Sequence, residues 1–220
     1  MILIPVKNLS AAKQRLAAVL DQPARTELAQ TMLHDVVAAL AAWPRRPDSA
    51  LVTSDPFSSD LARQYDFEII PDRDNSGETD AIEMATRICV QRGIDNTLVI
   101  PADIPLIQAA ELDQIFAVAP DEGSVLAPAA DGRGTNAIFR RPAKLFPLRF
   151  GNDSFKPHLA AAQATGKPCQ VLQLPGIAVD VDNPEDLQQL LACPGETRTQ
   201  RLIRKWALEG RLPGTKAESR

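Results

Sequence analysis

Cysteine, histidine and aromatic residues are scarce in this sequence of 220 residues, which has three cysteines, two histidines and 5% aromatic residues. The cysteines, Cys89, Cys169 and Cys193, are far apart and show no C-x-x-C spacing. The sequence therefore predicts neither a zinc site nor a disulfide framework. We expect free thiols in a reducing compartment.

Long apolar runs are also missing. No stretch approaches the roughly 18 consecutive apolar residues of a membrane-spanning helix. The apolar segment 1–5 is soon followed by Lys7, so it is too short for the core of a signal peptide and fits a buried strand better. These absences predict a cytoplasmic protein with no membrane partner.

Two nucleotide-binding motifs are absent as well. Neither G-x-G-x-x-G nor a P-loop occurs, which argues against a dinucleotide-dependent oxidoreductase or a P-loop ATPase. The net charge of −4 is uneven, because residues 197–220 contain seven Lys or Arg and two Glu, a net of +5, which leaves about −9 for the rest. This negative charge on residues 1–196 argues against a nucleic-acid partner, because binding to phosphates needs clustered cations.

The length suits one domain with a core of its own, and 45% of the residues are hydrophobic. We assign residues 1–196 to this domain and residues 197–220 to a basic, partly helical C-terminal tail. In the tail, Leu202, Trp206 and Leu208 are candidate packing residues, and we expect fraying after Gly210.

Short β-branched runs alternate with amphipathic stretches, a pattern typical of an α/β fold with a mostly parallel sheet covered by helices. The predicted strands are Ile2–Val6, Ala50–Thr53, Phe67–Ile70, Thr97–Ile100, Ser124–Ala127, Thr135–Phe139 and Cys169–Leu174. The predicted helices are Pro23–Ala42, Asp60–Tyr65, Asp80–Arg92, Ala109–Val118, Pro157–Ala164 and Pro184–Leu191. Ligands of such sheets bind beyond the carboxyl ends of the strands, where we expect the functional residues.

Three cations follow the first predicted strand. Lys7, Lys13 and Arg15 lie where the chain is expected to turn from the strand into a helix. Backbone N–H groups and a helix dipole at such a turn, with cations beside them, would cradle a polyphosphate. The alternative is a solvated, mildly basic helix start.

Three aspartates, in two further segments, are also expected at the carboxyl edge of the sheet. Asp103 follows the strand at 97–100, and Asp180 and Asp182 lie at i and i+2 on one side of an extended segment, where two oxygen ligands could face a metal ion. As an alternative, Asp103 opens a turn, and the negative charge of Asp182 or Asp186 interacts favourably with the dipole of the helix that starts at Pro184. That alternative leaves Asp180 unexplained, between two valines that suggest a strand.

Two glycine-bearing loops could hold an anion. Residues 131–136, D-G-R-G-T-N, join two predicted strands and offer backbone donors, the Thr135 hydroxyl and the Arg133 charge. Residues 150–158 place Gly151 and Ser154 ahead of a helix start. The plainer interpretation of the first loop is a hairpin turn. His158, beside the second loop, is a candidate ligand contact, whereas His34 on the long helix is expected to be structural.

These motifs together resemble one known family. P-V-K-N-L-S-A-A-K-Q-R-L, D-I-P, G-R-G-T-N, F-G-N-D-S-F-K-P-H and D-V-D-N-P-E-D-L occur in the order and spacing of the CofC/FbiD family, over residues 2–191. The resemblance implies a Rossmann-like nucleotidyltransferase fold, a glycosyltransferase-A-like three-layer sandwich. It also implies a reaction in which GTP is joined to a small phosphorylated three-carbon acid with release of pyrophosphate, in the biosynthesis of coenzyme F-420.

The resemblance also implies roles for individual residues. The family's metal ligands, for one or two Mg²⁺ ions, fall on Asp103, Asp180 and Asp182. The residues that hold the acid fall on Thr135, Gly151 and Ser154, and an early lysine falls on Lys7. In such a reaction Lys7, together with Lys13 or Arg15, would stabilise charge on the leaving pyrophosphate. A downstream transferase and a homodimer are further expectations. The acid is 2-phospho-L-lactate, phosphoenolpyruvate or 3-phospho-D-glycerate, and the sequence leaves the choice open.

One segment departs from the family. Residues 76–83, S-G-E-T-D-A-I-E, stand where a small, neutral run is usual. We expect Glu78, Asp80 or Glu83 to accept hydrogen bonds from guanine, unless the segment is only a solvated helix start. Three other functions stay open: a sugar-nucleotide glycosyltransferase, a guanylyltransferase for molybdopterin or a sugar phosphate, and a nucleotide-sensing module whose tail binds RNA.

Overall fold

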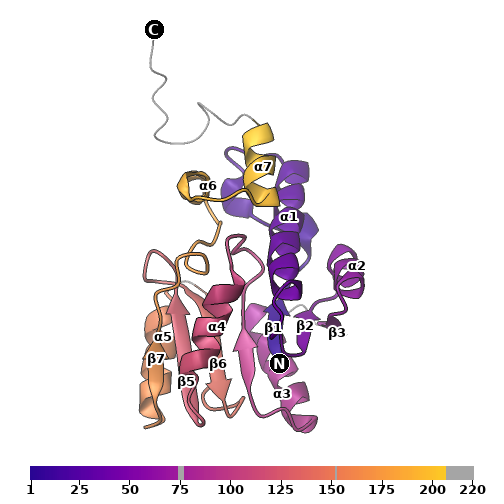
Figure 1. Cartoon of the computed structure of the whole chain (residues 1–220). Coiled ribbons are helices and arrows are strands. Elements are labelled where there is room, and N and C mark those ends of the chain that lie inside the picture. Colours follow the sequence, from indigo (N-terminus) through magenta and orange to yellow (C-terminus); the bar gives the residue numbers. More distant parts are fainter. Residues whose placement is uncertain (74–76, 152, 207–220) are drawn as a thin grey trace.

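The computed structural model describes residues 1–73, 77–151 and 153–206, within which seven strands form one sheet (Figure 1). The strand order is β3-β2-β1-β4-β6-β5-β7. The strands are β1 (Ile2–Pro5), β2 (Ser49–Val52), β3 (Glu68–Ile70), β4 (Thr97–Val99), β5 (Gly123–Pro128), β6 (Thr135–Arg141) and β7 (Cys169–Val171). β6 is antiparallel to both β4 and β5, and the other four pairs are parallel, so the expected mostly parallel sheet is confirmed.

Helices cover both faces of this sheet. These helices are α1 (Gln22–Ala41), α2 (Pro56–Gln64), α3 (Glu78–Gln91), α4 (Ala109–Val118) and α5 (Phe155–Ala164). Two more, α6 (Pro184–Ala192) and α7 (Arg198–Lys205), lie beyond the carboxyl ends of the strands. Among the described residues, none of these helices combines the length and apolarity that crossing a membrane requires. The three cysteines are unpaired, as the sequence predicts.

The strand residues alternate between two apolar cores, which makes the fold a three-layer sandwich. Ile2 and Ile4 pack into the core under α1, α2 and α4, whereas Leu3 between them packs into the core under α3 and α5. Because successive side chains of a strand point to opposite faces, a strand buried on both faces reads as a continuous apolar run. That is why the strands could be predicted from short apolar segments.

A third apolar cluster lies beyond the carboxyl ends of the strands. Leu28 and Met32 of α1 pack there with Val181, Leu187 of α6 and Ile203 of α7. Figure 1 shows α6 and α7 above the sheet, with α7 next to α1. The first part of the basic tail is thus attached to the domain. Leu208 and Gly210, which the sequence analysis assigns to packing and to the start of fraying, lie outside the described residues.

A buried carboxylate fixes α7 to α1. Asp35 of α1 accepts hydrogen bonds from the Thr199 N–H at 2.8 Å, the Thr199 hydroxyl at 2.7 Å and the Arg198 N–H at 3.2 Å. These are N–H groups of the first turn of α7, which lack partners within the helix. The carboxylate therefore stabilises the start of α7, and it sets the position of that helix on α1.

The segment after β1 differs from the prediction. Instead of entering a helix, residues 7–16 form two 3₁₀ turns, η1 (Leu9–Ala11) and η2 (Gln14–Leu16), with Lys13 between them at φ 55°. α1 begins only at Gln22, where Asp21 accepts a hydrogen bond from the Ala24 N–H at 2.9 Å. The expected helix dipole beside the cations is therefore wrong. The strand expected at residues 179–181 is also not formed; the segment belongs to no regular element, and the Val181 N–H donates to the carbonyl of Asp103 at 3.2 Å.

Candidate active site

Two cavities meet at the carboxyl edge of β1 and β4. The first, called the β1 cavity here, has a volume of about 410 Å³ and lies between the segment after β1, α1 and the start of α3. The second, called the hairpin cavity, has a volume of about 400 Å³ and lies between the β5–β6 hairpin, the loop before α5 and residues 180–183. Both are lined by Glu78, Pro101, Asp103 and Asp182, so these residues form their junction.

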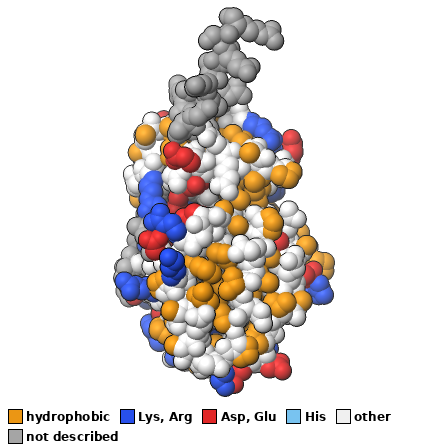
Figure 2. All heavy atoms as spheres, turned by 90° about the vertical axis from the view of Figure 1, so that its left-hand side faces the viewer, with side chains coloured by type: hydrophobic (Ala, Val, Ile, Leu, Met, Phe, Trp, Pro, Cys, Tyr) orange, Lys and Arg blue, Asp and Glu red, His pale blue; other side chains and the backbone are white. Residues whose placement is uncertain are grey.

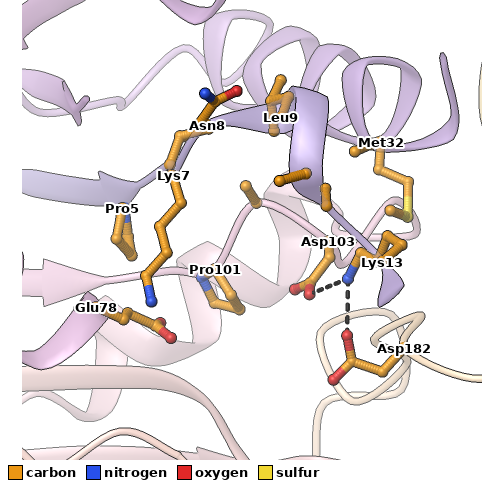
Figure 3. Close-up of a pocket in the computed structure, with 15 residues that line it drawn as sticks. Pro5, Lys7, Asn8, Leu9, Lys13, Met32, Glu78, Pro101, Asp103 and Asp182 are labelled. Carbon is orange, nitrogen blue, oxygen red and sulfur yellow. Dashed lines mark hydrogen bonds and ion pairs between the residues drawn. The ribbon is translucent and has the colours of Figure 1, made fainter. Parts of the chain in front are cut away.

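Lys13 holds two carboxylates at this junction. Its ammonium nitrogen lies 2.6 Å from Asp103 Oδ2 and 2.8 Å from Asp182 Oδ1, and the Lys13 side chain is 9% exposed (Figure 3). Burial alone would lower the pKa of Lys13, but the two carboxylates outweigh burial and raise it. The same contacts lower the pKa of Asp182 against the opposing effect of burial. Lys13 and Asp182 are therefore charged near neutral pH.

Asp180 lies in the hairpin cavity beside this cluster. Its Oδ1 accepts a hydrogen bond at 3.0 Å from Asn136 Nδ2, which also donates to the carbonyls of Ile177 and Ala178. Burial, and then the charge of Asp103, raise the pKa of Asp180 to about 6. Ionisation of Asp180 is thus less favourable than in water, and a cation nearby would stabilise the carboxylate. The sequence analysis assigns no role to Asn136; the available signal is an amide inside the predicted strand 135–139, which needs a hydrogen-bond partner when buried.

Glu78 faces both cavities from the first turn of α3. Burial, and then Asp103, raise the pKa of its carboxyl to about 7. Figure 3 shows the Lys7 side chain reaching from the segment after β1 toward Glu78. Lys7 lines the β1 cavity, and Arg15 lines the hairpin cavity with its Nη1 3.7 Å from Asp182 Oδ2. The structure thus brings all three predicted cations to the site.

The two other acidic residues of segment 76–83 do not line the cavities. Asp80 is exposed and is not among the residues that line either cavity. Glu83 accepts a hydrogen bond from the Leu148 N–H at 3.0 Å and lies 3.6 Å from the buried guanidinium of Arg140. Because α3 begins at Glu78, Asp80 and Glu83 fall on other faces of the helix. Of the three candidates for contacting the base, the structure brings only Glu78 to the cavities.

The three residues expected to hold the acid line the hairpin cavity. Thr135 begins β6, Gly151 lies in the loop before α5 at φ 131°, and Ser154 immediately precedes α5. The Ser154 hydroxyl donates to Thr135 Oγ1 at 3.2 Å. The Phe155 N–H donates to the carbonyl of Arg133 at 2.8 Å, which ties the α5 start to the hairpin. The residue next to Gly151, at position 152, lies outside the described residues.

The carboxylates suit a hard divalent cation in their chemistry. Within residues 1–73, 77–151 and 153–206, however, no three carboxylate, histidine or cysteine side chains are arranged as a metal site. The reason is visible at the junction, where the Lys13 ammonium lies between Asp103 and Asp182. Six carboxylates line the hairpin cavity, namely Glu78, Asp103, Asp131, Asp153, Asp180 and Asp182. That charge would repel a phosphorylated ligand unless cations accompanied it.

Figure 2 shows the molecule turned by 90° from the view of Figure 1, so that the side of β7 and α5 faces the viewer. Lys and Arg side chains lie next to Asp and Glu side chains on this face. At the mouth of the hairpin cavity, Arg133 pairs with Asp153 across the gap between the hairpin and the loop before α5. Hydrophobic side chains gather on the lower half of the same face. This face therefore carries both signs of charge.

A family model described as "Guanylyl transferase CofC like" matches residues 1–218. The chain belongs to this family. It is 35% identical to a phosphoenolpyruvate guanylyltransferase of Sphaerobacter thermophilus over 85% of this chain and 90% of the relative. It is 32% identical to a 3-phospho-D-glycerate guanylyltransferase of Colwellia psychrerythraea, over 91% and 95%. It is also 32% identical to a 2-phospho-L-lactate guanylyltransferase of Methanothermobacter thermautotrophicus, over 92% and 89%.

A solved structure supports the fold independently. A putative nucleotide-diphospho-sugar transferase from Desulfovibrio desulfuricans superposes with a TM-score of 0.75 at 18% identity, covering 93% of each chain. At that identity the likeness shows the fold alone. The family match confirms the resemblance drawn from the five sequence motifs, and with it a guanylyltransferase with a nucleotidyltransferase fold.

Proposed function

We propose that this protein transfers the guanylyl group of GTP to the phosphate of a small phosphorylated three-carbon acid, releases pyrophosphate, and so makes the nucleotide-linked precursor of coenzyme F-420. The proposal places the reaction in the cytoplasm. The observation that carries it is the junction of the two cavities at Lys13, Asp103 and Asp182. A nucleotide in one cavity and an acid in the other would present their phosphates to each other there.

The β1 cavity suits the nucleoside. Pro5, Leu9, Met32 and Pro101 give it apolar walls for a base and ribose. Glu78 adds an acceptor for the donor edge of guanine, which adenine does not share. Lys7, Lys13 and Arg15, which line the two cavities, provide positive charge for the triphosphate and for the pyrophosphate as it leaves.

The hairpin cavity suits the acid. The hydroxyls of Thr135 and Ser154 and the backbone at Gly151 are neutral hydrogen-bonding groups, and Arg133 adds a guanidinium at the rim. Such groups match phosphate and carboxylate oxygens. Phosphoenolpyruvate, 3-phospho-D-glycerate and 2-phospho-L-lactate all carry both a phosphate and a carboxylate, so this cavity suits each of them. Phosphoenolpyruvate is the first acid to test, because several relatives at 34–38% identity carry that name.

The chemistry needs positioning and charge neutralisation more than proton transfer. The attacking phosphate oxygen is already ionised near neutral pH, because the second pKa of a phosphate monoester is about 6. No general base is required, and the one buried histidine near the site is neutral, since burial and the charge of Arg140 lower the pKa of His158 to about 4. The protein's task is to align two anions in line and to offset their repulsion.

Magnesium fits this task. Asp103, Asp180 and Asp182 are the residues that would hold one or two Mg²⁺ ions, which would neutralise charge on the reacting phosphates. Support comes from Asp180, because burial and the charge of Asp103 raise its pKa and a bound cation would offset both effects. Binding would require Lys13 to release Asp103 or Asp182. Lys13 would then be free to contact the nucleotide phosphates.

The test is a direct assay. Purified protein is incubated with Mg²⁺, GTP and each of the three acids separately, and pyrophosphate release is measured; ATP replaces GTP in a parallel series. We expect release with GTP and at least one acid, and little with ATP or without Mg²⁺. A downstream transferase that consumes the product is added in a second series, in case the product is labile. Absence of release in every combination would contradict the proposal.

A further inference from the structure

One buried histidine ring connects two of the segments that form the hairpin cavity. His158, on the first turns of α5, is 1% exposed and is not among the residues that line either cavity. Its Nε2 accepts a hydrogen bond from the Arg149 N–H at 2.8 Å, and its Nδ1 lies 3.0 Å from Thr135 Oγ1. The ring thus connects the loop that carries Gly151 with β6, from behind the cavity wall.

These contacts determine where the ring carries its proton. The Arg149 N–H is a donor, so Nε2 must offer a lone pair and cannot be protonated. A neutral imidazole has one N–H, which then lies on Nδ1 and donates to Thr135 Oγ1. A doubly protonated ring would set Nε2–H against the Arg149 N–H. Burial and the nearby Arg140 charge, which lower the pKa of His158 to about 4, agree with a neutral ring.

The proton on Nδ1 in turn orients the Thr135 hydroxyl. Thr135 Oγ1 accepts from His158 Nδ1–H and from the Ser154 hydroxyl at 3.2 Å. A hydroxyl oxygen has two lone pairs, and both are now used. The hydroxyl proton of Thr135 is what remains, and Thr135 lines the hairpin cavity. The group is therefore presented to a ligand as a donor, which suits a phosphate or carboxylate oxygen.

We propose that His158 is a positioning residue for the phosphorylated acid: its Nδ1–H tautomer orients the Thr135 hydroxyl to donate to an anionic oxygen of that substrate. This inference rests on the proposed function. It assigns His158 no contact with the substrate, and it predicts that the two ring nitrogens have separable effects. Nδ1 governs affinity for the acid through Thr135, whereas Nε2 holds the backbone of the loop.

Two substitutions separate the nitrogens. The amide nitrogen of asparagine can take the place of Nδ1, and the amide oxygen of glutamine can take the place of Nε2. His158→Gln should keep the acceptor for the Arg149 N–H and lose the donor to Thr135. His158→Asn should keep the donor and lose the acceptor. The matched control is His34→Gln on α1, whose ring contacts Tyr65 away from both cavities.

We expect His158→Gln to raise the KM for the acid about tenfold and to leave the KM for GTP within about twofold, which is the size of one lost hydrogen bond to a charged group. His158→Asn should restore most of the affinity for the acid. In a Thr135→Val background, His158→Gln should add little, because both changes remove the same interaction. Thermal unfolding of each variant shows that it is folded.

Three results would overturn the inference: an unchanged KM for the acid in His158→Gln, a parallel rise in the KM for GTP, or an additive effect on top of Thr135→Val. Calorimetric titration of phosphoenolpyruvate and the other two acids, without GTP, makes the same comparison without turnover. Missing pyrophosphate release would therefore count against the proposed function alone. A wild-type protein that binds none of the acids would overturn the inference as well.

A measurement on the wild-type protein tests the inference even if the His158 variants do not fold. The chain has two histidines, so their ring ¹⁵N resonances can be assigned with the His34→Gln variant. We expect the His158 ring near neutral pH to carry its proton on Nδ1 alone, which is the minor tautomer of free histidine. A ring protonated on Nε2, or on both nitrogens, would rule out the proposed orientation of Thr135.

Discussion

The β1 cavity and the hairpin cavity meet at Asp103 and Asp182, yet they hold their polar groups in different ways. Around the β1 cavity the polar groups are charged: Lys13 bridges two aspartates, and Lys7 reaches toward Glu78. The hairpin cavity is also lined by carboxylates, but one part of its wall is neutral: Thr135 and Ser154 are joined by a hydrogen bond, and Thr135 contacts His158 behind the wall. Cations can change the ion pairs around Lys13, whereas buried hydrogen bonds hold the neutral groups around Thr135 in place.

This difference agrees with the two tasks of the proposed reaction. The nucleotide and its metal ions bring large charges, so their site needs ionic groups that can exchange partners. The acid must be held in one orientation for in-line attack, so its site needs hydrogen bonds that do not depend on pH near neutrality. Four changes would break or sharpen the comparison.

The largest effect is expected at Asp180, which lines the hairpin cavity beside Asp103 and Asp182. Asp180→Asn should lower turnover by more than about 100-fold, beyond the range of changes to groups that only orient a metal ligand. The fold should persist, because asparagine removes a carboxylate whose ionisation burial makes less favourable. The measurement is kcat at saturating Mg²⁺, with the melting temperature as control. Turnover like that of the wild type would remove Asp180 from the mechanism.

Lys13→Met comes next. It leaves Asp103 and Asp182 facing each other without their cation, so turnover should fall on the order of 100-fold, as for loss of a group that stabilises transition-state charge. The melting temperature should also fall, most clearly at low salt, because like charges then lie close together. Lys7→Met is the matched control for stability, since Lys7 is exposed and takes part in no salt bridge within the described part of the chain. Equal loss of stability in both variants would contradict this prediction.

A smaller effect concerns stability against pH through Glu78. Its pKa is about 7 in the folded protein and near 4.5 when unfolded, so the folded state binds the extra proton between those values. The free energy of unfolding should therefore fall as pH rises through this range. Glu78→Gln should remove that part of the dependence. Melting temperatures without nucleotide or metal, from about pH 4.5 to 7.5, test this; parallel curves for the two proteins would refute it.

The smallest effect is expected at the end of the tail. Deletion of residues 211–220 should leave turnover nearly unchanged, because the sequence there has no apolar pattern that would pack against the domain. The deletion protein is compared with the full chain in the pyrophosphate assay. A loss of about tenfold or more, worth about 1.4 kcal/mol, would show that the tail reaches one of the cavities or an interface between copies.

Much of the fold could be predicted from local sequence. The strands were found because each is a short apolar run between turn signals, and α1 because Pro23 and an apolar face mark its start and its buried side. Prediction failed where tertiary contacts decide. Residues 7–16 lack an apolar face of their own; they form 3₁₀ turns held by contacts such as the Leu9 N–H donating to Asp55 at the start of α2.

The candidate site was predicted in its residue types more than in its arrangement. Motif order pointed to Asp103, Asp180 and Asp182, and the structure brings them to one cavity. Lys13 was assigned to the leaving group, but nothing local shows that it lies between two of these aspartates. Asp80 and Glu83 were candidates beside Glu78 because helix phase cannot be set until the helix start is known.

By itself the sequence determined the α/β architecture, the family and the set of acidic and basic residues that reach the carboxyl edge of the sheet. Those follow from local patterns of apolarity and from motifs that need no distant partner. Tertiary structure alone decided which charge pairs with which, the raised pKa of Glu78 and Asp180, and the proton position on His158. The reason is physical: burial and charge pairing depend on atoms far apart in the chain that only the fold brings together.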